Sequence, residues 1–361
     1  MGNVRVIREQ LMPEHQVFIS EMGARKKNDI REICEFVRPH IGLITSIGPQ
    51  HLETFKKIEN VAQTKGELLV GTLNKNTRGQ NVSEYDGILD MTKNMFRSFF
   101  PKAKDTSSVS DETGKTKELR TTFEDGAVFL PKDGAWCEQL YRNDSHEKKY
   151  LYSLSNNGAD IYAKDIKVTK EGSQFTVVSK KNGEYNCITK LLGKHNVQNI
   201  LGAISIAEYL GLSKEQIIAG VSKIEAVEHR LQLLPSNNGT TVIDDAFNSN
   251  PEGCKAALEV ISGFDGRKII ITPGMVELGE EEDKLNKEFG KQMAKVVDIA
   301  ILVGPRHTKP IVDGLKEEKF DDMNIYVVKD LNDATAKLGS LVKIGDIILF
   351  ENDLPDSYNE S

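Results

Sequence analysis

Along the first part of the chain, short apolar runs alternate with segments whose apolar side chains recur every three or four positions. The runs at 16–20 and 41–47 predict buried strands, and the segments 28–38 and 58–70 each place their apolar residues on one helical face. Pro39 ends the first of these helical patterns. Strand and helix in alternation are typical of a mostly parallel sheet covered by helices, so we expect an α/β fold.

The middle of the chain has two different patterns. Residues 72–122 include a stretch, 105–117, in which Val109 is the sole aliphatic residue, and this predicts a mobile polar insertion. Between 126 and 187, alternating runs separated by Gly and Asn turns predict antiparallel strands that flank the main sheet. These runs lie at 127–130, 161–168, 175–178 and 185–188.

Helical periodicity and strand runs return in the last part of the chain. Helices are predicted at 196–210, where Gly211 stops the helix, and at 214–224, where Ser213 caps it. Five strands are then predicted at 241–244, 267–272, 299–303, 324–328 and 346–350. Helices are expected between them at 251–262, 282–296, 308–317 and 331–340. This order predicts a second, Rossmann-like α/β domain that begins near residue 229.

The charge balance limits the classes of partner. The 361 residues include 47 basic and 54 acidic side chains, for a net charge of −7. This argues against a nucleic-acid partner and an anionic membrane surface, because both attract surplus Lys and Arg. The four cysteines form no C-x-x-C pair, and no apolar run approaches the roughly 20 residues of a membrane span. We therefore expect a cytoplasmic protein without disulfides.

Three side chains in the first half of the chain are candidates for a metal site. Glu21 follows the predicted strand at 16–20, where a carboxylate could hold Mg²⁺ beside a phosphate or merely face solvent. His51 follows the next predicted strand, as a metal ligand or as a structural turn residue. Lys65 lies in the predicted helix 58–70, and its pattern alone indicates a surface lysine.

Four further side chains are suited to a nucleotide. Asn196 and Asn199 lie three apart at a predicted helix start, so their amides could read the edge of an adenine, or Asn196 could cap the helix. Arg230 lies at the predicted domain boundary, where it could bind a phosphate or form an interdomain salt bridge. Asp245 ends a predicted strand, where a carboxylate commonly binds a ribose hydroxyl.

The order of seven short motifs resembles the Mur ligases, the ATP-dependent, amide-forming enzymes of peptidoglycan synthesis. The likeness covers residues 16 to 350 apart from the polar insertion. In chain order the motifs are EMGA, GPQHLE, TKGE, GKHNVQN, HRLQ, DDAFNSNP and GMVELG. The last two look most like the branch that adds D-alanyl-D-alanine to the UDP-muramoyl tripeptide.

This resemblance assigns roles to the candidates by position. Glu21 and His51 match the family's Mg²⁺ ligands, and Lys65 matches a lysine whose carbamate helps to hold a second Mg²⁺. The implied reaction uses ATP to convert a carboxylate of a UDP-muramoyl peptide into an acyl phosphate, which the amine of D-alanyl-D-alanine then attacks. The matched nucleotide contacts are Asn196 and Asn199 for adenine, Arg230 for phosphate and Asp245 for ribose.

The sequence departs from the family pattern near its start. In the family a phosphate loop, G-x-x-G-K-[ST], precedes the Glu21 motif, and residues 1–15 form none. The tripeptide Gly114-Lys115-Thr116 lacks the earlier glycine and lies in the polar insertion. We expect a truncated Mur ligase central domain over 1–228, a C-terminal domain over 229–361, and little activity from this chain alone. The alternatives are a non-catalytic module that binds a nucleotide or partner, and a ligase of the same superfamily with another amine acceptor.

Overall fold

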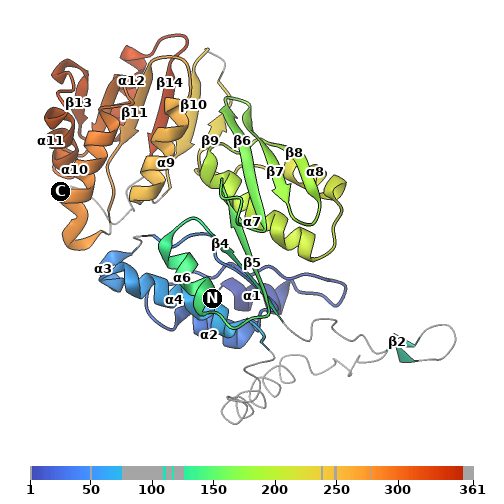
Figure 1. The fold of residues 1–361 in the computed structure, drawn as a ribbon. Helices are drawn as coiled ribbons and strands as arrows, with labels where there is room; N and C mark the ends of the chain where they lie inside the picture. The colour runs from blue at the N-terminus through green and yellow to red at the C-terminus, as the bar shows by residue number, and fades with distance from the viewer. Residues whose placement is uncertain are drawn as a thin grey trace.

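The computed structural model describes residues 2–48, 51–74, 109–110, 116–117, 126–236, 239–247, 250–276 and 278–352. These residues form two six-stranded sheets in two successive domains, each with helices packed on both faces (Figure 1). A separate short sheet pairs β2 (Val109–Ser110) with β3 (Thr116–Lys117). Beyond residue 74 the rest of the predicted polar insertion, Gly114 and Lys115 included, lies outside the described residues.

The sheet of the first domain has the strand order β1-β4-β5-β6-β7-β8. The first four strands run parallel: β1 (Ile41–Leu43), β4 (Ala127–Pro131), β5 (Lys148–Ser153) and β6 (Ile161–Thr169). The antiparallel strands β7 (Gly172–Ser179) and β8 (Gly183–Thr189) extend it at one side. A parallel sheet with antiparallel flanking strands was predicted, and the structure confirms it.

Two apolar clusters lie on the two faces of this sheet. On one face, Val128 and Leu130 pack with Leu69 of α4 (Ile58–Gly71) and Cys137 of α6 (Ala135–Asn143). The other face is covered by α7 (Lys194–Tyr209) and α8 (Lys214–Ser222), which pack on β6 to β8. The remaining helices are α1 (Gly2–Glu9), α2 (Asp29–Val37) and α3 (Leu52–Phe55). Burial on both faces explains why all five residues of β4 are apolar.

Two predictions for the first domain are wrong, and several elements, α1 and α3 among them, were missed. Residues 16–20 form no strand, and Ile19 is 88% exposed, because an apolar run becomes a strand only where a neighbouring strand accepts its backbone hydrogen bonds. The run at 127–130 is β4, which lies parallel between β1 and β5 rather than in the antiparallel flank. Helix α6 and strand β5 were not predicted, since the lysines that open β5 hide its buried end.

The second domain follows its predicted order closely. Its sheet has the order β13-β12-β11-β14-β10-β9, and all pairs are parallel except β9 (Gln232–Leu234) with β10. The parallel strands are β10 (Thr241–Asp245), β11 (Lys268–Thr272), β12 (Ile299–Val303), β13 (Ile325–Val328) and β14 (Ile347–Glu351). The helices are α9 (Pro251–Ser262), α10 (Glu282–Met293), α11 (Lys309–Glu317) and α12 (Leu331–Leu341), with short 3₁₀ turns η1 (Gly279–Glu281) and η2 (Asp322–Asn324).

The two faces of the second sheet are also packed separately. Ile270 packs with residues of α9, α10 and α11, whereas Ile269 and Ile271 pack with Ala334 of α12. Helix α9 begins as predicted, with Pro251 in its first turn and the Asn250 side chain accepting hydrogen bonds from two backbone N–H groups. Its N-terminus therefore has a fixed position at the carboxyl end of β10.

The two domains contact each other at several places, two of which lie at opposite sides of the molecule. At the connection between them, Leu192 of the first domain belongs to the apolar cluster of the second, and Val168 packs against the same cluster. At the opposite side, Gly279 of η1 lies against the backbone of Glu53 in α3, with a φ of 61° that a side chain would strain. Figure 1 shows this approach of the blue and orange helices. These contacts hold the carboxyl ends of β1 and β10 near one pocket.

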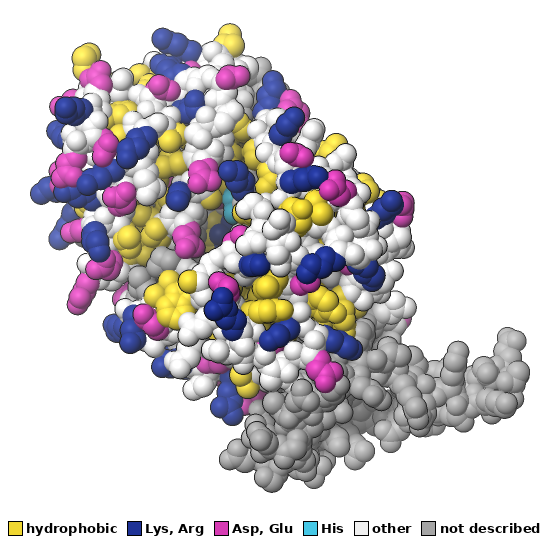
Figure 2. Space-filling model, in the orientation of Figure 1, with side chains coloured by type: hydrophobic (Ala, Val, Ile, Leu, Met, Phe, Trp, Pro, Cys, Tyr) yellow, Lys and Arg dark blue, Asp and Glu magenta, His cyan; other side chains and the backbone are white. Residues whose placement is uncertain are grey.

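The surface charges, the cysteines and the length of the helices can be compared with the expectations from composition. Basic and acidic side chains are interspersed over both domains on the face shown in Figure 2. All four cysteines are buried free thiols. Within the part of the chain that the structure describes, no helix is long and apolar enough to cross a membrane.

Candidate active site

Helix α4 brings Lys65 back to the chain that leaves β1. Its Nζ donates a hydrogen bond to the Ser46 carbonyl oxygen at 2.9 Å, and the side chain is half-buried rather than a plain surface lysine. Burial lowers the pKa of Lys65, while the nearby Cys137 and Glu252 act in the opposite direction. A lower pKa increases the neutral fraction of the amine, which is the form that reacts with carbon dioxide to give a carbamate.

A pocket of about 200 Å³ lies beside this lysine, between the two domains. The first domain contributes Ser46 and Ile47 after β1, the segment 133–137 that begins α6, and Gln198 of α7. The second domain contributes Glu252, from the first turn of α9. The Glu252 carboxylate lies against Gly48, where an added Cβ would be only 2.2 Å from its Oε2. Glycine at position 48 is what allows this carboxylate to approach the loop after β1.

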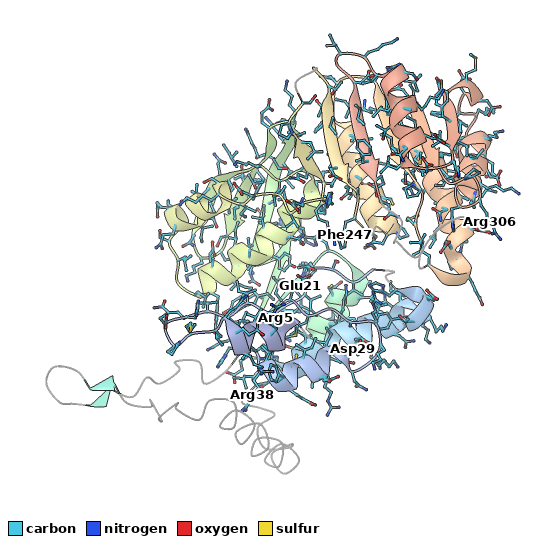
Figure 3. All side chains as sticks on the ribbon, turned by 180° about the vertical axis from the view of Figure 1, so that it is seen from behind. Arg5, Glu21, Asp29, Arg38, Phe247 and Arg306 are labelled. Carbon is cyan, nitrogen blue, oxygen red and sulfur yellow. The ribbon has the colours of Figure 1, made fainter. Side chains whose placement is uncertain are left out.

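The two predicted metal ligands lie in irregular chain, which corrects the position expected for Glu21. Glu21 is exposed, and it lies in the extended segment between α1 and α2 instead of at a strand end; Figure 3 labels it beside Arg5 of α1. Its carbonyl oxygen accepts a hydrogen bond from the Asn3 side chain at 3.3 Å. His51 has a φ of 49°, and its carbonyl accepts the Thr54 and Phe55 N–H groups that begin α3.

These donors suit a cation that takes most of its ligands from elsewhere. Among the described residues there is no group of three or more His, Cys, Asp or Glu side chains placed to hold a metal ion. Mg²⁺ usually takes one or two protein carboxylates and completes its shell with substrate phosphates and water. The carboxylate of Glu21, the imidazole of His51 and a carbamate on Lys65 fit that pattern of ligation in kind.

The candidates for adenine recognition lie at the start of α7. Gly193, with a φ of 91°, occupies the cap position, so Asn196 is not the helix cap. Instead the Asn196 amide donates to the Leu192 carbonyl at 2.8 Å, and Asn199 is exposed one turn later. His195 lies between Gly193 and Asn196 in the same turn. Burial lowers its pKa to about 4, which keeps the imidazole neutral. The first turn of α7 is therefore a half-buried polar surface without positive charge on its histidine.

Arg230 and Asp245 lie together where the second domain begins. The Arg230 guanidinium stacks over the Phe247 ring at 4.0 Å from its centroid, and the arginine side chain stays exposed. Among the described residues, Arg230 forms no interdomain salt bridge, which was the alternative expected from the sequence. The Asp245 carboxylate accepts the Leu231 N–H at 2.9 Å. Burial raises the pKa of Asp245, whereas its hydrogen bonds and the charge of Arg230 oppose that shift.

A loop after β11 connects this region to the interdomain contact at η1. The buried Asn286 of α10 accepts the Met275 N–H at 2.9 Å and donates to the Met275 carbonyl at 2.8 Å. The Asn352 side chain donates to the Gly274 carbonyl. These bonds fix the motif 274–279, apart from residue 277, which lies outside the described residues. The loop thus carries η1 to its position against α3.

Sequence reasoning missed several of the residues that line the pocket. Glu252 and the segment 133–137 had no motif assigned to them. The signal for Glu252 was its place in the first turn of a proline-started helix that follows a predicted ligand-binding strand end. Trp136 and Cys137 belong to α6, which was not predicted, so no pattern in the sequence indicated that they lie near Lys65.

Comparisons with known proteins agree with this architecture. The model of the Mur ligase middle domain matches residues 3–117 and 114–207, and that of the Mur ligase glutamate ligase domain matches 229–351. The UDP-N-acetylmuramoyl-tripeptide–D-alanyl-D-alanine ligase of Haemophilus influenzae is 28% identical over 282 residues, covering 78% of this chain and 50% of that protein. The Bacillus subtilis enzyme of the same name is 25% identical over 345 residues, covering 94% and 62%.

Solved structures show the same fold at lower sequence identity. A crystal structure of MurF from Acinetobacter baumannii superposes with a TM-score of 0.73 at 19% identity, covering 95% of this chain and 63% of that one. MurF ligase from Thermotoga maritima in complex with ADP gives a TM-score of 0.68 at 18% identity, covering 92% and 63%. The chain spans about half to two thirds of the length of these relatives. Two family models together match most of the chain, and the protein belongs to the Mur ligase family.

Proposed function

We propose that this chain takes part in ATP-dependent amide bond formation in the synthesis of peptidoglycan precursors. The substrates proposed are a UDP-muramoyl peptide, which supplies the carboxylate, and D-alanyl-D-alanine, which supplies the amine. The observation that carries the proposal is Lys65, half-buried beside a pocket to which both domains contribute. The names of the relatives from Haemophilus influenzae and Bacillus subtilis support this choice of substrates.

The nucleotide is proposed to lie between the start of α7 and the end of β10. Asn196 and Asn199 present amides to the adenine, and Asp245 presents a carboxylate to the ribose hydroxyls. Arg230 would leave its exposed stack on Phe247 to contact a phosphate, a change that breaks one cation–π contact of about 0.5–1 kcal/mol. The ADP in the Thermotoga maritima relative supports a nucleotide in this fold.

Glu21, His51 and a carbamate on Lys65 would hold Mg²⁺. The ion supplies neutralisation of the phosphate charge during transfer. The chain's own contribution is to keep Lys65 largely buried, so that its neutral amine can be carbamylated, and to hold the Ser46 carbonyl beside it.

The proposed chemistry has two steps. A substrate carboxylate oxygen takes the γ-phosphoryl group of ATP, which releases ADP and gives an acyl phosphate. The amine nitrogen then attacks the acyl carbon, phosphate leaves, and the amine loses a proton. The closed contact between Gly279 and Glu53 would limit the access of water, which competes with the amine for the acyl phosphate.

A second function is favoured by one sequence observation. The printed sequence contains no G-x-x-G-K-[ST] loop, and in other nucleotide-binding folds such a loop cradles the β- and γ-phosphates. A non-catalytic module that binds a nucleotide or a partner would need no such loop. A ligase with another amine acceptor is the further alternative.

The deciding experiment measures ADP release with Mg²⁺, ATP, UDP-muramoyl tripeptide and D-alanyl-D-alanine in bicarbonate buffer. Turnover that requires the amine is the result expected of a ligase, and replacing the dipeptide with other amines tests the acceptor. Absence of turnover from folded protein, with retained ADP binding, favours the module. Repeating the assay with an upstream segment that carries a phosphate loop then shows whether the loop is what the chain requires.

A further inference from the structure

Among the described residues, Glu252 is the second domain's one carboxylate in the lining of the interdomain pocket. It comes from the first turn of α9, whose start is fixed by the Asn250 cap and Pro251. The carboxylate reaches across to Gly48, in the loop after β1. Burial raises the pKa of the Glu252 carboxyl, and the positive charges of Lys65 and Lys255 oppose that shift. A negative group is thus placed on the side of the pocket from which the second domain would present a substrate.

The other carboxylate in the pocket lining is already committed to the fold. Asp133 accepts hydrogen bonds from the Ser153 hydroxyl at 2.7 Å and from the Leu154 N–H at 2.8 Å. These bonds use both of its oxygens to hold the end of β5. Of the two carboxylates that line the pocket, Glu252 is therefore the one placed to receive a ligand.

A cationic partner for Glu252 is present in the chain itself. The charge of Lys65 acts on Glu252, and Glu252 acts on Lys65 in return. The ammonium group of Lys65 thus occupies the kind of environment that a substrate ammonium would need. If Lys65 becomes a carbamate, as the proposed function requires, its positive charge is lost, and of the two lysines that act on Glu252 only Lys255 keeps its charge.

We propose that Glu252 binds the ammonium group of the incoming amine substrate and so positions its nitrogen in the interdomain pocket. This inference rests on the proposed function, to which it adds a positioning residue for the amine. The ionised Glu252 carboxylate forms a charge-assisted hydrogen bond with the substrate ammonium group before the amine loses its proton. Ligands without a positive amine would lose this contact.

Trp136 allows the pocket to be observed directly, because it lines the pocket and is the single tryptophan of the chain. Its fluorescence would be titrated with D-alanyl-D-alanine and with N-acetyl-D-alanyl-D-alanine, in bicarbonate buffer. We expect saturable binding of the free amine, and affinity about tenfold weaker or worse for the acetylated dipeptide, which lacks the charge. Equal affinity for both dipeptides, or no saturable change with either, would overturn the proposal.

Variants separate the carboxylate from the rest of the pocket. E252Q should weaken binding of the free dipeptide by about tenfold or more, and E252D should retain part of the affinity. The matched control is E59Q, because Glu59 lines the neighbouring groove that shares Trp136 but lies outside this pocket. Wild-type affinity in E252Q would refute the role, and far-UV circular dichroism on each variant shows that the comparison is between folded chains.

A variant of Lys65 provides an independent test of the proposal. In K65M the ammonium group of Lys65 no longer competes for Glu252, so amine binding should become independent of bicarbonate, whereas wild-type affinity should fall when carbon dioxide is excluded. Measured beside ADP release, this arm distinguishes the two proposals. Amine binding that depends on Glu252 without turnover would support the binding role and remove the ligase function. Turnover with an amine dependence unchanged in E252Q would leave the ligase and refute the binding role.

Discussion

The close packing of α10 on α11 predicts how an added Cβ atom changes the stability of the protein. The two helices meet at Gly290 and Gly314, where each glycine faces the backbone of the other helix. A Cβ added at Gly314 would lie 2.0 Å from the Lys287 carbonyl oxygen and 3.0 Å from the Lys291 nitrogen. Because these are backbone atoms, the added methyl group can be accommodated only if the helices separate by roughly 1 Å or more.

The expected cost of Gly314→Ala follows from that separation. Overpacking of a close contact costs about 1–3 kcal/mol, and the intrinsic helix preference for alanine offsets up to about 1 kcal/mol of it. Gly339 in α12 is the matched control, because an added Cβ there meets no atom within 4 Å. We expect Gly339→Ala to stabilise the protein by about 0.5–1 kcal/mol. The same substitution should therefore act in opposite directions at the two positions.

Differential scanning calorimetry measures both variants, and hydrogen exchange locates the effect. Exchange should rise in peptides from α10 and α11 of Gly314→Ala, and in the loop that Asn286 of α10 holds at Met275. That loop leads to the contact of Gly279 with Glu53, so the variant should also loosen the interdomain edge. If Gly314→Ala is as stable as Gly339→Ala, the helices do not approach as closely as the structure shows.

Three further predictions concern buried polar groups. Burial lowers the pKa of His195 from 6.5 to about 4, so between these pH values the unfolded chain binds a proton that the folded chain does not. The free energy of unfolding should therefore fall by about 3 kcal/mol as the pH drops from 6.5 to 4, and H195Q should lack this pH dependence in urea unfolding. Arg267→Met leaves the buried Asp346 without its ion-pair partner and should cost about 3–5 kcal/mol near neutral pH in thermal unfolding. Burial acts to raise the pKa of Asp346, but hydrogen bonds from Arg267 and the Lys343 N–H outweigh it and lower this pKa. The stabilisation by the pair is therefore present above the ordinary pKa of an aspartate and is lost as the pH falls through the lowered pKa of Asp346. Tyr152→Phe removes the phenol that donates to the Ile44 carbonyl at 2.7 Å, and this should cost about 1–3 kcal/mol. Urea unfolding followed by Trp136 fluorescence measures the loss, and unchanged stability would mean that another donor replaces the phenol.

The second domain was predictable because its strands are buried on both faces. Runs such as Ile299–Val303 are apolar throughout, and capping residues such as Asn250 mark where the helices begin. The first domain was harder to predict from local pattern. Strand β5 opens with two lysines, and the apolar run at 16–20 has no neighbouring strand among the described residues. Pairing with a neighbour decides whether such a run becomes a strand, and sequence periodicity does not report it.

The candidate site divides in the same way. Lys65 was found by family resemblance, and only the structure shows that it is half-buried beside Ser46. Asn196 and Asn199 were placed correctly on one helix, although the helix begins two residues earlier than predicted. Glu252 could not be connected with Lys65 from sequence, because their electrostatic interaction joins residues of two domains almost two hundred positions apart. Local patterns identify the elements, but the contacts between domains depend on the tertiary fold.

The packing of Leu192 and Val168 into the apolar cluster of the second domain restricts how the two domains can move. Residues that belong to one domain by chain order are part of the other's interior, so pulling the domains apart would expose apolar surface at that point. Motion is less costly if it is a rotation about this shared interior, which opens the opposite edge between Gly279 and Glu53. The pocket near Lys65 would then open as a wedge, and the second domain, cut from the first, would expose part of its own core.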